Sequence, residues 1–369
     1  MSGSTVAVAA QSLQQLVAEI FAVAGCSRGE SERIARHLVA ANLTGHDSHG
    51  VVRVQRYIQM MRDKLVVADQ EIKVLVDTPV LAVVDGQYGF GQTVAPQAVA
   101  IGISKCKAMG LASVSLRHAG HIGRAADWAE MAAKDGLVSI HFVNATGSVL
   151  VAPFGSAERR FSTAPYCVGV PLQGHEPLLL DFATSTVAEG KVMVASQGGR
   201  AVAQDALIGP DGKINNDPRM LYGDYQPGEQ RDIRKGKGAL RAFGAHKGSG
   251  LALMCELLGG ALTGNGATAT ERRFSNGMLS IYIDPKRVDP ENMFPEEVAR
   301  YVAYVRAAKP AAPDGEIVMP GEPEQRMRAQ RLAQGVPVAS ETWNTLLETA
   351  RTVGVREEQL HTAQVTLSN

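Results

Sequence analysis

The stretch from residue 81 to 143 constrains the fold more than any other part of the chain. Apolar runs at 81–84, 111–116 and 137–143 have the length of buried strands, and the first ends at the turn pair Asp85-Gly86. Between them, 94–109 and 125–133 carry apolar residues at helical spacing. The resulting order is β-α-β-α-β. Since helices in this order cover the faces of a sheet, the sequence predicts a layered α/β domain.

Both ends of the chain instead show helical periodicity. Helices are expected at 11–25, 30–43, about 51–61, 295–308, 322–333 and 341–352. The middle adds strand candidates at 166–170, 178–181 and 278–283, and helices at 184–195 and 248–262. Residues 309–315 have the composition of a linker. We therefore predict a helical domain built from residues 1–75 plus 287–369, flanking a central α/β domain at 76–286.

The charge balance argues against a nucleic-acid partner. Lys+Arg and Asp+Glu both number 37 in 369 residues, so the chain has no global positive field. The one dense basic run, 231–241, is interpreted as a solvated loop, with a contact to a cofactor phosphate as the alternative. Four scattered cysteines lack metal-ligand spacing, and there is no secretory signal and no run long enough to span a bilayer. A cytoplasmic protein without a membrane partner is expected.

A histidine-rich corner, His46-Asp-Ser-His49, interrupts the helical pattern at the N-terminal end. Arg53 follows His49 by one helical turn, and Tyr57 extends the same face by another. An arginine fork matches a carboxylate, and a histidine can pass a proton near neutral pH. His49 and Arg53 could thus address one small carboxylate ligand. The alternative is a structural corner capped by Asp47 or Ser48, with solvated histidines.

Two further groups follow predicted strands, where functional side chains collect in α/β folds. His121 lies in the run 117–123, between a strand and a helix, and glycines on both sides let backbone approach a ligand. Asp181 ends the strand of the run 178–185. Its carboxylate could close that strand, orient a histidine or bind a ribose hydroxyl. His246 and Lys247, at the start of a glycine-studded helix, form a plausible anion site.

Two other signals carry less weight. The run 264–269 fits G-x-G-x-x-A but follows a helix, and 89–91 lacks the third glycine, so no Rossmann fingerprint is present. The pairs His46/His49 and His118/His121 are both H-x-x-H, which keeps a metal-dependent hydrolase or lyase as an alternative function. No acidic ligand pattern such as HExxH accompanies them.

Six segments together resemble the malate/L-lactate dehydrogenase family of NAD(P)-dependent oxidoreductases, which is unrelated to the Rossmann-type enzymes and includes ureidoglycolate, sulfolactate and diketogulonate members. They are GHDSHGVVRVQRYI, RHAGHIGRAADWAEMAA, VAPFGSAERRFSTAPY, LLLDFATSTVAEGK, FGAHKGSGLALMCELLGGALTG and VMPGEPEQRMRAQRLAQGVPV, in family order over nearly the whole chain. The chain looks most like the hydroxycarboxylate dehydrogenase B branch.

The resemblance implies a non-Rossmann nucleotide-binding sheet domain, helices from both termini that dimerise, a homodimer, and an active site in an interdomain cleft. It implies a 2-hydroxycarboxylate dehydrogenase using NAD or NADP, with NAD favoured. By position, Ser48, His49 and Arg53 line the substrate site, and His121 is the second catalytic histidine. The residues matching cofactor-contacting segments are His49, Gly123, Arg124, Ala125, Leu179, Leu180, Asp181, Phe182, Ala183, His246, Lys247, Asn276, Met319, Pro320, Gly321 and Glu322.

The implied reaction interconverts a 2-hydroxy acid and its 2-oxo acid. In reduction, an imidazolium would give its proton to the developing alkoxide. We favour His49 as this donor, with Ser48 beside it and Asp181 behind it, and His121 polarising the substrate oxygen. A non-catalytic relative that keeps the fold as a cofactor-binding module is a further alternative.

Overall fold

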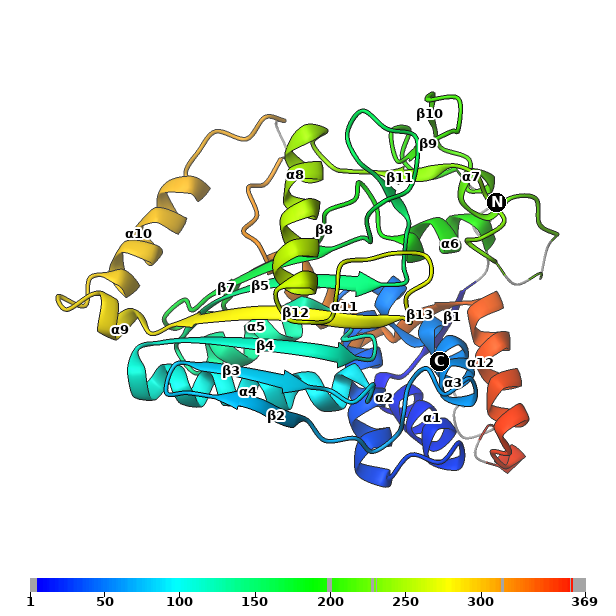
Figure 1. Cartoon of the computed structure of the whole chain (residues 1–369), viewed down its shortest axis with the longest axis horizontal. Coiled ribbons are helices and arrows are strands. Elements are labelled where there is room, and N and C mark those ends of the chain that lie inside the picture. The colour runs from blue at the N-terminus through cyan, green and yellow to red at the C-terminus, as the bar shows by residue number, and fades with distance from the viewer. Residues whose placement is uncertain are drawn as a thin grey trace.

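A seven-stranded mixed sheet forms the centre of the protein (Figure 1). The computed structural model describes residues 5–197, 201–226, 229, 231–312, 315–358 and 360. In order across the sheet the strands are β2 (Lys73–Asp77), β3 (Leu81–Asp85), β4 (Leu111–Ala119), β12 (Ser275–Ile283), β5 (Val138–Thr146), β7 (Pro165–Val170) and β8 (Leu178–Ala183). Only β3 and β4 pair in parallel among these neighbours. The predicted non-Rossmann α/β sheet is confirmed.

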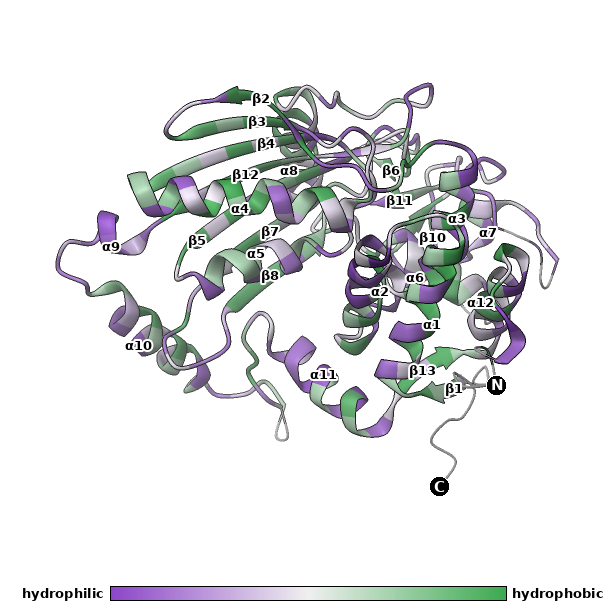
Figure 2. Cartoon of the chain, turned by 90° about the horizontal axis from the view of Figure 1, so that it is seen from below, coloured by the Kyte–Doolittle hydropathy of each residue, from purple (hydrophilic) through white to green (hydrophobic). Residues whose placement is uncertain are grey.

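Helices cover both faces of this sheet. They are α4 (Gly91–Met109), α5 (Ala125–Lys134) and α8 (His246–Cys255), which continues as a π-helix, Glu256–Ala261. Successive residues of a strand point to opposite faces. Val143 of β5 accordingly packs in the cluster formed with α4 and α5, whereas its neighbour Phe142 packs in the cluster that contains Ala252 of α8. Figure 2 shows α4 and α5 across one face of the strands.

Both chain ends build the helical part, as predicted. It contains α1 (Ala10–Val23), α2 (Arg28–Leu43), α3 (Val54–Arg62), α12 (Ser340–Val353) and the antiparallel pair β1 (Thr5–Val8) and β13 (Val336–Ala339). One buried apolar cluster joins side chains between residues 8 and 66 to side chains between 336 and 360. These elements gather at one end of the molecule (Figure 1). The exact domain boundaries remain a prediction.

Segments on both sides of β7 and β8 in the sequence form a small lobe. Its elements are β6 (Val151–Ala152), α6 (Glu189–Gln197), β9 (Leu207–Ile208), β10 (Ile214–Asn215), α7 (Arg219–Tyr222) and β11 (Ala239–Arg241), around their own apolar cluster. α6 begins at Glu189, so the expected start at 184 was wrong. Thr184 N instead donates to Thr163 O at 2.9 Å, and Ser185 Oγ donates to Val187 O at 2.8 Å.

The basic run 231–241 belongs to this lobe. Arg231 stacks over the Tyr225 ring at 4.0 Å, and Arg234 and Lys235 pair with Asp232 and Glu229. The run ends in the buried strand β11. These cations therefore have partners within the lobe.

The chain then leaves the sheet through α9 (Pro285–Val288) and α10 (Phe294–Arg306) and returns through α11 (Glu322–Gln334). α10 has no buried residue and stands at the far end of the sheet from α12 (Figure 1). Residues 313 and 314 of the predicted linker lie outside the described residues. Within the described part of the chain, no helix combines the length and apolar character needed to cross a membrane.

Candidate active site

The helix break at the histidine corner is held by hydrogen bonds. Two 3-10 turns, Asp47–His49 and Val51–Arg53, separate α2 from α3. Asn42 Nδ2 donates to Asp47 Oδ1 at 2.6 Å, and Asn42 Oδ1 accepts from Val51 N at 2.8 Å. A Cβ at Gly50 would overlap the Asn42 amide. The corner thus needs Gly50, and its geometry is fixed by α2.

Asp47 has a structural partner in α11. Arg331 Nη1 and Nη2 donate to the two Asp47 carboxylate oxygens at 2.7 and 3.1 Å. His46 Nε2 lies 3.3 Å from Glu324 Oε1, also on α11. α11 therefore braces the corner through His46 and Asp47.

The loop after β4 carries His121 and is equally constrained. Asn276 Oδ1 accepts from Ile122 N at 3.0 Å, and Asn276 Nδ2 donates to Asn144 O at 2.8 Å. A Cβ at Gly91, the first residue of α4, would lie 2.5 Å from Ile122 Cα and would overlap His121 O. Backbone packing and one buried amide thus fix the position of His121.

The two histidines predicted to be catalytic lie together. The rings of His49 and His121 stack with centroids 5.5 Å apart and an interplanar angle of 23°. His49 Nδ1 lies 3.0 Å from Ser48 Oγ, and His121 Nδ1 lies 2.6 Å from the hydroxyl of Tyr57. Both histidines are half-buried. The fold therefore brings the corner and the β4 loop to one place.

A short hydrogen-bond chain orients His121. Gln92 Nε2 donates to the Tyr57 hydroxyl at 3.2 Å, which directs the Tyr57 hydrogen toward His121 Nδ1 and leaves the neutral ring's hydrogen on Nε2. In this orientation Gln92 Oε1 is buried without a hydrogen-bond partner. Rotation of the Gln92 side-chain amide by half a turn would reverse the direction of both hydrogen bonds. The Tyr57 hydroxyl could then accept from a protonated His121 Nδ1, so these hydrogen bonds can serve either protonation state of His121.

Both imidazoles are held neutral. Burial lowers the pKa of His121 to about 3, and Arg53 contributes in the same direction. Burial, followed by His121 and Arg53, also lowers the pKa of His49 well below its ordinary value. Burial raises the pKa of Tyr57 to about 12. The hypothesis from the sequence has an imidazolium as the proton donor in reduction. In the protein without substrate, both rings are neutral and can instead accept a proton.

Arg53 has a partner that the sequence reasoning missed. Its Nε donates to Ser48 O at 2.6 Å, and its Nη2 lies 3.4 Å from Glu189 Oε2. The Tyr222 hydroxyl donates to Glu189 Oε1 at 2.7 Å. An acidic residue in the first turn of a helix has an ordinary explanation in the helix dipole, so nothing in the local pattern distinguished Glu189.

Asp181 does not contact the histidines. Its Oδ2 accepts from Ala126 N at 2.8 Å, at the start of α5, and the described residues include no hydrogen bond from it to His49 or His121. Burial raises the pKa of Asp181. The expectation that Asp181 stands behind His49 is therefore not met: the His49 ring is bonded to Ser48, and Asp181 ties β8 to the first turn of α5.

The segments predicted to contact a cofactor adjoin one another. The Asp181–Ala126 bond joins β8 to the residues after Gly123, and Leu179 N donates to Pro320 O at 3.1 Å. Phe182 and Phe243 pack edge to face at 5.2 Å, which brings β8 close to the start of α8. Through Ile122, Asn276 reaches the same loop. Segments that are far apart in the sequence thus adjoin one another in one region of the fold.

The residues of this region fit a dinucleotide. Gly123 (φ +73°) and Gly321 (φ +96°) adopt left-handed backbone, and a Cβ at Gly321 would come within 3.3 Å of Leu179 N. His246 and Lys247 are exposed in the first turn of α8, where backbone N–H groups favour a phosphate. Arg124 Nε is buried without a hydrogen-bond partner. Glu322 Oε2 accepts from Met319 N at 2.8 Å and shapes the 319–322 turn.

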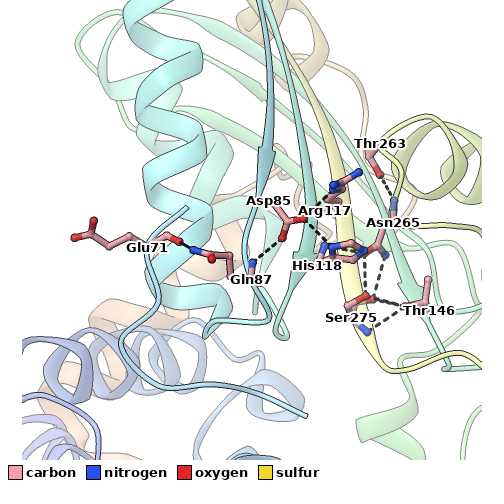
Figure 3. A network of polar contacts seen from close by, with 9 residues as sticks. All are labelled: Glu71, Asp85, Gln87, Arg117, His118, Thr146, Thr263, Asn265 and Ser275. Atoms are coloured by element: carbon pink, nitrogen blue, oxygen red, sulfur yellow. Dashed lines mark hydrogen bonds and ion pairs between the residues drawn. The ribbon is translucent and has the colours of Figure 1, made fainter. Parts of the chain in front are cut away.

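His118, the other histidine of the His118/His121 pair, makes a different set of contacts from His121. Its ring Nδ1 lies 3.0 Å from Asp85 Oδ2, its backbone N–H donates to Asn265 Oδ1 at 2.9 Å, and its ring stacks on Tyr88 with centroids 4.9 Å apart. Arg117 Nε donates to the same Asp85 oxygen at 2.9 Å (Figure 3). His118 and His121 thus have separate partners. In the described ranges, no three His, Cys, Asp or Glu side chains are grouped so that they could hold a metal ion.

The protein combines a mixed sheet with a helical unit built from both chain ends, and two stacked imidazoles lie where they meet. These features differ from those of a Rossmann dehydrogenase. The family model for malate/L-lactate dehydrogenase matches residues 8–347. The chain belongs to this family and is an oxidoreductase of hydroxy acids.

Individual relatives agree with this assignment. Hydroxycarboxylate dehydrogenase B of Escherichia coli (strain K12) is 36% identical over 357 residues, which cover 95% of each chain. L-Lactate dehydrogenase of Cupriavidus necator is 30% identical over 350 residues, covering 93% of this chain and 97% of the relative. A solved structure of a proposed malate/lactate dehydrogenase from E. coli superposes with a TM-score of 0.90 at 34% identity, covering 98% of this chain and all of the other.

Proposed function

We propose that the protein is an NAD(P)-dependent dehydrogenase that interconverts a 2-hydroxy carboxylic acid and its 2-oxo acid. The observation that carries the proposal is the stacking of His49 and His121 at 5.5 Å, with Arg53 close enough to depress the pKa of both. The similarity to a hydroxycarboxylate dehydrogenase and to an L-lactate dehydrogenase supports hydroxy-acid substrates such as lactate. NAD is favoured over NADP.

His49 is proposed as the proton-transfer residue. When His49 Nδ1–H donates to Ser48 Oγ, the Nε2 lone pair is free to take the hydroxyl proton of a 2-hydroxy acid. A bound nicotinamide dinucleotide supplies the hydride chemistry, accepting hydride from C2 in oxidation and returning it in reduction. In reduction, His49 returns its proton to the new hydroxyl oxygen. A substrate carboxylate close by favours the protonated ring that this step needs.

His121 and Arg53 are proposed to hold the substrate. The Tyr57 hydroxyl on His121 Nδ1 leaves Nε2–H to donate to the substrate oxygen and polarise the C–O bond. The Arg53 guanidinium, with Nε anchored on Ser48 O, offers its remaining N–H groups to the carboxylate. Asp181 is proposed to orient the cofactor region through Ala126.

The experiment combines cofactor binding with turnover. NADH or NADPH should raise the unfolding temperature, because a ligand that binds only the folded state stabilises it. A panel of 2-oxo acids is then assayed with the preferred cofactor. His49→Asn and His121→Asn should each lower kcat by about 10²–10⁴-fold if they act in proton transfer and polarisation. Near-wild-type kcat in both variants would contradict the proposed site.

The same assay separates the alternatives. A non-catalytic relative would bind the dinucleotide without turnover of any 2-oxo acid. A metal-dependent hydrolase or lyase would lose activity with a chelator, whereas the proposed dehydrogenase would keep it.

We also propose a cytoplasmic homodimer. The four cysteines are free and buried, which suits a reducing compartment. Light scattering during size exclusion should give twice the chain mass of 39.2 kDa. A single-chain mass at micromolar concentration would contradict the dimer.

A further inference from the structure

Glu189 places a carboxylate directly beside the arginine proposed to bind substrate. Glu189 Oε2 lies 3.4 Å from Arg53 Nη2, and the two side chains are 15% and 19% exposed. A substrate carboxylate bound to the same guanidinium must therefore share the site with a negative charge that already belongs to the protein. This charge bears on which substrates the site accepts.

The position of Glu189 is fixed from two sides. The Tyr222 hydroxyl, which is buried in the small lobe, donates to Glu189 Oε1 and keeps Oε2 toward Arg53. The backbone of the next residue, Gly190, packs against the corner: a Cβ there would lie 3.0 Å from Ser48 Cα and 3.2 Å from Arg53 Nη2. Movement of Glu189 away from the site would therefore require the lobe to move as well.

The charges around the paired histidines nearly cancel. Burial lowers the pKa of both His49 and His121, so neither ring contributes a cation to the protein without substrate. Arg124 pairs with Asp127. Arg53 and Glu189 then leave no net charge. A substrate with one carboxylate adds one negative charge beside Arg53 and Glu189, whereas a dicarboxylate adds two.

We propose that Glu189 is a specificity-determining residue. It restricts the site to 2-oxo and 2-hydroxy acids with a single carboxylate and an uncharged or cationic remainder, and it disfavours dicarboxylates. The physical basis is repulsion between the Glu189 carboxylate and the second carboxylate of a dicarboxylate, because like charges close together in a half-buried site are unfavourable. The inference rests on the proposed dehydrogenase activity and narrows its substrate class.

The test uses substrates that differ in one charge. The full chain with its preferred cofactor is assayed on oxaloacetate against its 4-methyl ester, and on 2-oxoglutarate against its 5-methyl ester. Wild type should prefer the esters by about 10–100-fold in kcat/KM. Glu189→Gln keeps the shape and the acceptor for Tyr222 but removes the charge, and it should reduce the preference to within about threefold.

Tyr222→Phe is the matched control. It removes the other partner of Glu189 while the carboxylate remains, so the ester preference should persist even if overall activity falls. A purely structural role for Glu189 would change kcat/KM for both members of a pair equally in Glu189→Gln. That result, or a wild-type enzyme that reduces dicarboxylates as well as their esters, would overturn the inference.

A binding measurement separates this inference from the proposed function. Oxamate and oxalate are unreactive analogues that differ by one charge. With the cofactor present, oxamate should raise the unfolding temperature of wild type more than oxalate, and Glu189→Gln should close the gap. Absence of turnover on every 2-oxo acid would overturn the dehydrogenase proposal itself, whereas turnover with an unchanged ester ratio would overturn only the role of Glu189.

Discussion

At the scale of single residues, the structure explains why Tyr57 stands one turn beyond Arg53. Its hydroxyl is the partner of His121 Nδ1, and Gln92 donates to that hydroxyl. A histidine whose Nδ1 is occupied in this way has its Nε2 free for substrate. We therefore propose that Tyr57 acts through His121 as a positioning residue, whereas the helical spacing alone suggested a direct substrate contact.

Tyr57→Phe tests this role. The variant keeps the ring in the apolar cluster and loses only the hydroxyl, so His121 is no longer held in one tautomer. We expect kcat to fall by about 10–100-fold, as for partners that orient metal-binding imidazoles, with a smaller change in KM. Steady-state kinetics with Tyr304→Phe, an exposed tyrosine, as the control would check it. Equal kcat in the two variants would remove Tyr57 from the mechanism.

Sequence patterns brought some site residues together but not all. The i, i+4 spacing suggested that His49 and Arg53 share a helix face, but they lie in two separate 3-10 turns, and Arg53 reaches the corner through its bond to Ser48 O. The strand-end rule pointed to His121. That the two would meet at 5.5 Å depended on tertiary structure. Glu189 was missed because its contact with Arg53 joins residues 136 positions apart. Asp181 was expected behind His49, but its carboxylate binds the start of α5, a contact 55 positions away in the sequence that no local pattern shows.

At the scale of elements, the β-α-β-α-β prediction was right in order and incomplete in topology. β12 inserts between β4 and β5 and is antiparallel to both. Residues 275–283 thus separate two strands that the local pattern would place side by side. Periodicity reports only which face a strand buries, so non-local pairing of this kind lies outside what it can predict. The same holds for the pairing of β1 with β13 across the whole chain.

Gly91→Ala tests how an element positions the site. The added methyl would meet His121 O and Ile122 Cα, which are backbone atoms and cannot rotate away. We expect α4 and the His121 loop to separate, with kcat reduced at least tenfold. Gly29→Ala is the matched control, because Gly29 also lies in the first turn of a helix but its Cβ would meet only Arg33 Nη1 at 3.5 Å. That variant should be neutral or more stable by up to about 1 kcal/mol.

Steady-state kinetics and thermal unfolding of the two glycine variants test whether Gly91 positions the His121 loop. Loss of kcat in Gly91→Ala with retained cooperative unfolding would support a positioning effect. Full activity in Gly91→Ala would show that the His121 loop adjusts without cost.

At the scale of the whole molecule, the central sheet carries a titratable group that the mechanism does not use. His141 of β5 is fully buried, with Nδ1 2.8 Å from Ser280 Oγ and Nε2 3.0 Å from Ser139 Oγ. Both partners are hydroxyls, and no carboxylate of the described residues is bonded to the ring to stabilise a positive charge. Burial accordingly lowers the pKa of His141 to about 3.

This placement predicts how global stability depends on pH. The folded pKa of His141 lies below the ordinary value of 6.5, so between about pH 6.5 and pH 3 the unfolded chain binds more protons than the folded one. The free energy of unfolding should therefore fall as pH drops below 6.5, by about 2 kcal/mol between pH 7 and pH 5 from this residue alone. His49 and His121 add to the fall with the same sign.

The His141→Gln variant tests this prediction. Its side chain can still bond the serines and does not titrate, so its free energy of unfolding should decline less steeply with falling pH, by about that amount. Urea unfolding at several pH values measures the difference, with the exposed His175→Gln as the control. Parallel pH profiles for wild type and His141→Gln would mean that the sheet accommodates a charged ring at this position.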